Sequence, residues 1–158
     1  MCAVFSFALR FSDYFGHWKG VQALKRRLPR EYAFKILFMI DIGTNDAENA
    51  MRYLLDDAGF SSKEEFFCTM LVEGVESKKK ELDEMLSKHL VNWQFNRLAA
   101  TVRNILRIAL YELLYFDDIP PAVSINEAIE LTKIYHDEEA ARFVNGILDT
   151  IYKQAETN

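Results

Sequence analysis

A basic segment around one proline has the clearest potential for chemistry in this sequence. Pro29 suits the first turn of a helix, and an apolar stripe at helical spacing follows over residues 33–40. A helix start is already positive, so each added cation costs about a few tenths of a kcal/mol while no anion is bound. The free N–H groups there bind anions, so we interpret the segment as a phosphate-binding site, with a disordered basic tail as the alternative. Its cations are Lys25, Arg26, Arg27 and Arg30.

A second possible site lies in the segment RFVNGILD, residues 142–149. Phe143 falls one position off an apolar stripe and follows Arg142, which is consistent with an exposed aromatic side chain that is available for stacking. We expect it to be partly exposed and close to the basic segment. Asn145 and Gly146 are poor helix formers, and we expect the glycine to let another backbone approach closely.

Two further cations stand four residues apart beside an apolar stripe. Arg103 and Arg107 repel each other slightly at this spacing on a helix, so a compensating anion is expected. A salt bridge to a neighbouring helix and a bound ligand both satisfy this requirement, and the sequence leaves them open.

Catalytic and metal-binding patterns are missing from the sequence. It holds no glycine-rich phosphate loop, zinc-protease motif or nucleophile elbow, and its three histidines are scattered. Cys2 and Cys68 are isolated, which is typical of reduced thiols in a cytoplasmic protein. No apolar run approaches the about 18 residues that span a membrane. We therefore expect a non-enzymatic protein without metal or cofactor.

Charge is distributed unevenly along the 158 residues. The net charge is −5, yet residues 1–38 carry seven Lys and Arg against two acids, and the rest carries twelve against twenty-two. This asymmetry indicates a local anion-binding face on a body that repels anions. The lysine run at 78–80 lies among acids, so we interpret it as a solvated helix face rather than a nucleic-acid patch.

Helical periodicity and turn signals predict an all-α fold of six helices in two three-helix halves. The expected helices cover residues 30–42, 46–58, 63–89 and 98–118, a fifth opened by a Ser124–Glu127 capping box, and 138–153. The globular part is expected over 24–154, with halves of about 24–92 and 93–154 and a tail at 155–158. Residues 1–23 lack a clean period and are expected to be a disordered arm or the result of a start assigned too far upstream.

Several segments together resemble the NusB family of bacterial transcription antitermination factors. They are RRLPREYAFKILF from Arg26, LRIALYEL from Leu106, INEAIEL from Ile125 and FVNGILD from Phe143, and the resemblance runs from Leu24 to Lys153. It implies a helical protein that binds the boxA RNA of ribosomal-RNA leader transcripts. The resemblance also implies two protein partners: NusE, a small-subunit ribosomal protein, and the antitermination complex on RNA polymerase. A homodimer of the free protein is possible.

The resemblance also suggests which residues form the two surfaces. Val102 and Asn96 stand where the family often has acids, which leaves the orientation of Arg97 and Arg103 open. The main alternative is a helical protein–protein adaptor that does not bind RNA. The expected protein-partner residues are Tyr111, Glu112, Tyr115 and Glu127. The expected RNA-binding residues are Lys25, Arg26, Arg27, Arg30, Lys35, Arg103, Arg107, Arg142 and Phe143.

Overall fold

The computed structural model describes residues 26–43 and 46–157. Within these ranges the chain forms six α-helices and one short 3₁₀ helix and no strand, which confirms the all-α prediction. Lys25 and the predicted extension 1–23 lie outside them. No helix in the described ranges is long and apolar enough to cross a membrane. The elements are α2 (Arg27–Asp41), α3 (Ala47–Leu55), α4 (Ser62–Lys88), η2 (Phe95–Arg97), α5 (Ala100–Tyr115), α6 (Pro121–Tyr135) and α7 (Glu138–Glu156).

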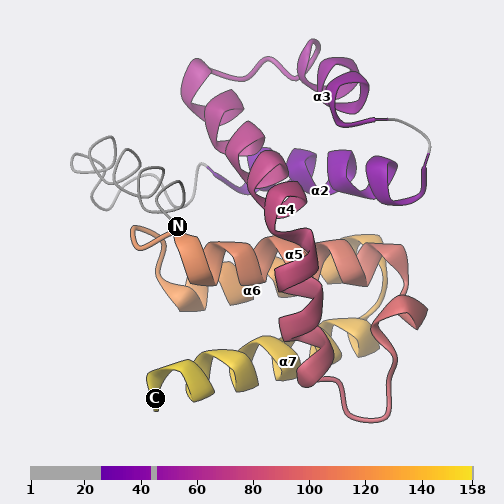
Figure 1. Ribbon diagram of the computed structural model, residues 1–158. Coiled ribbons are helices and arrows are strands. Elements are labelled where there is room, and N and C mark those ends of the chain that lie inside the picture. Colours follow the sequence, from indigo (N-terminus) through magenta and orange to yellow (C-terminus); the bar gives the residue numbers. More distant parts are fainter. Residues whose placement is uncertain (1–25, 44–45, 158) are drawn as a thin grey trace, which may run out of the picture.

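The helices pack in two groups that share the long helix α4 (Figure 1). α2 packs against α3 and α4, while α6 packs against α5 and α7. α5 contacts α2 and α4 as well, so a single hydrophobic core runs through both groups. Figure 1 shows α5 and α6 between α2 on one side and α7 on the other.

Several helix ends follow directly from local sequence signals. Ser61 caps α4 by accepting a hydrogen bond from the Glu64 N–H, and the Glu64 carboxylate accepts from the Ser61 N–H at 2.9 Å. This reciprocal pair is a capping box. Asp46 caps α3 through a single side-chain contact to the backbone, in which its carboxylate accepts from the Asn49 N–H at 2.8 Å. Gly43, after the end of α2, has a φ of 75°, a conformation that glycine adopts without a steric cost.

The predicted capping box at Ser124 and Glu127 is wrong. α6 begins three residues earlier, at Pro121. Proline fits the first helical position because the N–H of that residue would make no hydrogen bond within the helix, so its absence costs nothing. Ser124 is therefore inside the helix and buried, and its hydroxyl donates a 2.8 Å hydrogen bond to the Glu112 carboxylate of α5.

Helices α4 and α5 approach closely at Gly74. A methyl group at this position would overlap the ring of Tyr111, so glycine lets the ring come close to the backbone of α4. Tyr111 is 9% exposed as a result and belongs to the core.

Candidate RNA-binding surface

Arg30 is part of the protein interior and not of a free basic surface. It is 2% exposed, and its guanidinium contacts the Glu112 carboxylate with Nε–Oε1 and Nη2–Oε2 distances of 2.5 and 3.0 Å. Glu112 is itself 1% exposed. Two-point pairing of this kind is the arrangement in which a buried arginine and carboxylate satisfy each other. It leaves Arg30 no surface with which to contact a phosphate.

The two preceding arginines also pair with acids. Arg26 is buried, lies 2.9 Å from Asp118 and stacks its guanidinium over the Phe67 ring. Arg27 donates from Nε and Nη2 to Glu127 at 3.0 and 2.8 Å, but its side chain is 56% exposed. Acids of α6 and of the α5–α6 turn therefore pair with these two cations at the start of α2. Of the two guanidinium groups, that of Arg27 remains accessible from solvent.

Lys35 lies further along α2, in a polar cluster with Glu31 and Tyr135. Its amine is 2.9 Å from the Glu31 carboxylate, to which the Tyr135 hydroxyl also donates. Burial alone would raise the pKa of Glu31, but the bonds from Tyr135 and Lys35 outweigh it and lower the pKa. About a third of the Lys35 side chain remains exposed, so the ammonium can contact an anion at the surface.

Arg103 and Arg107 meet acids of the neighbouring helices, as the salt-bridge interpretation required. Arg107 is 3% exposed and bonds Asp83 at 2.7 and 2.8 Å and Asp41 at 3.2 Å. Arg103 bonds Asp41 at 2.6 and 3.0 Å. Burial raises the pKa of Asp41, but the two guanidinium groups outweigh it and hold that pKa below its usual value. Asp41, at the end of α2, thus orients Arg103 although Val102 replaces the acid frequent in the family.

The expected protein-partner residues are mostly interior. Tyr111, Glu112 and Glu127 are 9%, 1% and 8% exposed, because they pack on Gly74, pair with Arg30 and pair with Arg27, respectively. Tyr115 is 40% exposed, and its hydroxyl donates to Glu81 at 3.3 Å. Of these four side chains, Tyr115 therefore offers the largest surface to a partner.

Phe143 is half-buried at the edge of the core, which confirms that it is partly exposed. Arg142 beside it is exposed. The ring of Phe143 meets Trp93, in the connection between α4 and η2, with centroids 6.2 Å apart. α5 and α6 separate α7 from α2, so Phe143 and the basic segment do not form one continuous contact surface (Figure 1).

Sequence reasoning missed Trp93 and misjudged Gly146. Trp93 is 59% exposed, and the signal for it was an aromatic residue in the non-periodic segment VNWQFN. Gly146 was expected to make room for another backbone. A methyl group there would meet nothing within 4 Å, so that packing interpretation is wrong for the part of the chain described.

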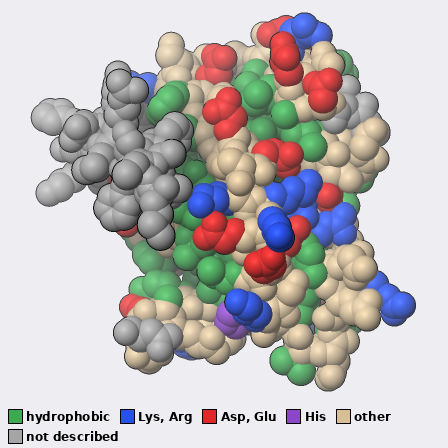
Figure 2. Space-filling model, viewed as in Figure 1, with side chains coloured by type: hydrophobic (Ala, Val, Ile, Leu, Met, Phe, Trp, Pro, Cys, Tyr) green, Lys and Arg blue, Asp and Glu red, His purple; other side chains and the backbone are tan. Residues whose placement is uncertain are grey.

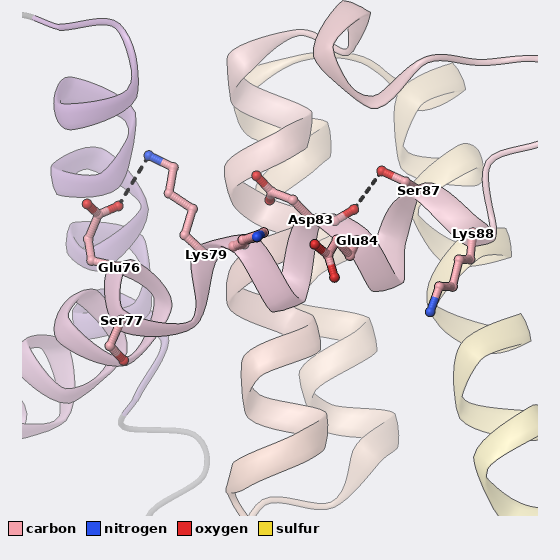
Figure 3. A pocket seen from close by; sticks show the side chains of 8 residues that line it. Glu76, Ser77, Lys79, Asp83, Glu84, Ser87 and Lys88 are labelled. Carbon is pink, nitrogen blue, oxygen red and sulfur yellow. Dashed lines mark hydrogen bonds and ion pairs between the residues drawn. The ribbon is translucent and has the colours of Figure 1, made fainter. Parts of the chain in front are cut away.

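The lysine run on α4 lines a shallow hollow that carries charges of both signs. Lys78 pairs with Glu81 at 3.1 Å and Lys79 with Glu76 at 3.6 Å, as expected of a solvated helix face. Figure 2 shows the mixed charges on this face, and Figure 3 shows the lining side chains along α4 with Lys88 at one end. Because acids and lysines both line the hollow, it does not attract phosphate as an all-cationic groove would.

No group of His, Cys, Asp and Glu in the described ranges could hold a metal ion. Cys68 is fully buried on α4, and burial raises the pKa of its thiol to about 12. A thiol in this state is not a nucleophile at neutral pH. The described surface carries exposed cations on α2 and α7, and the half-buried Phe143 beside the exposed Trp93.

These features define a class, the all-helical binding proteins. The sequence matches the NusB family model over residues 27–153, and the chain belongs to the NusB family. Transcription antitermination protein NusB of Bacillus velezensis is 46% identical over 134 residues, which cover 85% of this chain and 100% of the relative. Since such relatives are named antitermination proteins, both the family and the non-enzymatic character predicted from the sequence are confirmed.

Two solved structures share the fold at the level of the whole helical domain. NusB of T. maritima has a TM-score of 0.76 and 39% identity, covering 81% of this chain and 90% of that one. A chain in a crystal structure of the antitermination factors NusB and NusE in complex with double-stranded RNA has a TM-score of 0.75 and 28% identity. That match covers 82% of this chain and 96% of the other.

Proposed function

We propose that this protein is a cytoplasmic antitermination factor that binds the boxA RNA of ribosomal-RNA leader transcripts together with NusE. The observation that carries the proposal is its match over residues 27–153 to a family whose fold has been solved with NusE and RNA. The complex then acts on RNA polymerase. The free protein is either a homodimer or a monomer that pairs with NusE.

The exposed residues provide the direct RNA contacts in this proposal. They lie on two separate parts of the surface. Arg27 and Lys35 on α2 present cations to phosphate groups at one part. At the other part, on α7, Arg142 presents a cation and Phe143 presents part of its ring to a base. The buried Arg26, together with Arg30 and Arg107, supports the fold instead. Arg103 is 18% exposed and its guanidinium is paired with Asp41, so little of its charge is free to contact RNA.

Replacing Phe143 by alanine tests the RNA-binding function. We expect boxA RNA affinity to fall at least about tenfold, since stacking on an aromatic ring contributes about 1–3 kcal/mol per base. The free energy of unfolding should fall by less than the about 3–5 kcal/mol typical of a fully buried phenylalanine. Fluorescence anisotropy with labelled RNA and urea unfolding on the same preparation measure both. Tyr53→Ala, which removes a 73% exposed ring from α3, is the control and should change neither.

A large stability loss with normal affinity per folded molecule would mean that Phe143 is a core residue only. If the wild-type protein bound NusE but no RNA at any salt concentration, the adaptor interpretation would replace the RNA-binding one. Light scattering with and without NusE separates the homodimer from the heterodimer. For the NusE surface we propose the end of α5, where Leu114 and Tyr115 are 39% and 40% exposed.

A further inference from the structure

Trp93 is a large apolar side chain whose exposure the fold does not explain. It is 59% exposed, and its indole meets the Phe143 ring edge-on, with an interplanar angle of 63°. Val91, two residues earlier, is 78% exposed. Exposed apolar groups gathered in one place commonly mark a binding surface. The exposed part of the indole is therefore available to a ligand.

The connection that carries Trp93 is held in place by its neighbours. Asn92 has a φ of 62°, in the left-handed region, which turns the chain just before Trp93. Phe95 lies under the guanidinium of Arg107 at 5.4 Å, and Leu98 is 8% exposed in the core. Figure 1 shows this connection beside α7. An aromatic ring on an anchored segment is preorganised to bind, so less conformational entropy is lost on binding.

Gly146 adds a second, independent observation at the same place. It lies three residues after Phe143, so the two positions are neighbours on the surface of α7. Glycine is among the poorest helix formers, yet the space above this one is open and no internal contact requires it. An open glycine beside the exposed Trp93 and the half-buried Phe143 permits close approach from outside the protein.

We propose that Trp93 and Phe143 form a two-ring platform for unpaired RNA bases, with Gly146 as its open floor. The inference rests on the proposed function and deepens it, since Trp93 becomes a second stacking residue and unpaired bases become the preferred ligand. Bases splayed from a single strand stack on such rings, whereas bases in a duplex are already stacked on each other. Exposed Arg97 and Arg142 flank the two rings in sequence and supply charge for the adjoining phosphates.

Tryptophan fluorescence tests the platform directly. The chain has two tryptophans, and Trp18→Phe leaves Trp93 as the single emitter. Titration with single-stranded boxA RNA should quench its emission, and the same RNA annealed to its complement should quench it much less. Trp93→Ala should weaken single-strand binding by about fivefold or more, while Trp93→Phe keeps most of the affinity. Tyr53→Ala serves as the matched control.

Gly146→Ala separates binding from folding. Alanine is a better helix former, so the thermal midpoint should rise, while affinity for the single strand should fall about threefold or more as the methyl group closes the floor. A structural role for this position would instead move both quantities in the same direction.

Each outcome decides something different. If the wild-type protein bound no RNA, the proposed function itself would fail. If it bound RNA but Trp93 emission and the affinity of Trp93→Ala were unchanged, the platform alone would be overturned. Quenching by NusE without RNA, with no quenching by RNA, would make this surface a protein contact and would also overturn the inference.

Discussion

The basic start of α2 and the aromatic pair beside α7 are used in opposite ways. At the start of α2, the charged side chain of Arg30 is buried and neutralised by Glu112. Beside α7, the apolar side chain of Trp93 is exposed. A buried charge needs a partner inside the protein, and an exposed large ring gains one from outside. The comparison shows that residue type alone does not decide which residues form a binding surface. A side chain that already has a partner inside the protein is not available to a ligand.

The largest effect is expected from breaking the buried pair. Glu112→Ala removes the carboxylate that pairs with Arg30 at two points and leaves, among the described acids, only Glu127, 3.6 Å from Nη1, so the free energy of unfolding should fall by about 3 kcal/mol. Urea unfolding monitored by circular dichroism measures this loss of stability. The double variant Arg30→Met, Glu112→Leu removes both charges and should recover most of the loss. If this folded double variant lost RNA affinity, Arg30 would act in binding as well as in folding.

A smaller loss in the free energy of unfolding is expected from Gly74→Ala, a substitution in the protein interior. The added methyl group overlaps the Tyr111 ring and forces α4 and α5 apart, which costs about 1–3 kcal/mol for overpacking. Tyr111→Leu in the same chain frees the space and should restore part of the stability. Thermal unfolding of the three variants is the measurement, and an unaltered midpoint for Gly74→Ala would show that the ring can move away at little cost.

The acid at the end of α2 predicts a pH dependence. Asp41 has a pKa below its usual value of 3.8, so its contribution to stability is present above about pH 4 and is lost as pH falls through the lowered pKa. Asp41→Asn should therefore cost about 1–3 kcal/mol near pH 7, and the difference from wild type should shrink below about pH 4. Unfolding curves across this range check it. A difference that stayed constant with pH would contradict the charge-based account.

The smallest stability effect is expected from Arg27, the exposed member of the basic segment. Arg27→Gln removes a half-exposed ion pair and should change the free energy of unfolding by less than about 1 kcal/mol. The slope of log K against log salt for RNA binding should flatten by about 0.7, the value for one lost phosphate contact. An unchanged slope would remove the start of α2 from the RNA surface.

The helices were predictable because their signals are local, whereas the roles of the arginines were not. The periodic stripes and the Ser61 cap each lie within one segment of the chain. Arg30, in contrast, has its partner 82 residues away at Glu112, and no local pattern shows this pairing. Arg103 and Arg107 are intermediate, since their spacing demanded an acid but did not identify Asp41. The partial exposure of Phe143 was predictable because this residue departs from the apolar stripe by one position.

The burial of Cys68 has a practical consequence for observing this fold in motion. Thiol reagents need access to the sulfur and a thiolate to react with. In the folded state Cys68 is 0% exposed and the pKa of its thiol is about 12, so neither condition is met. In a Cys2→Ser background, the rate at which a thiol reagent modifies Cys68 therefore measures how often α4 opens from the helices packed around this residue. This modification rate can be measured with or without RNA bound.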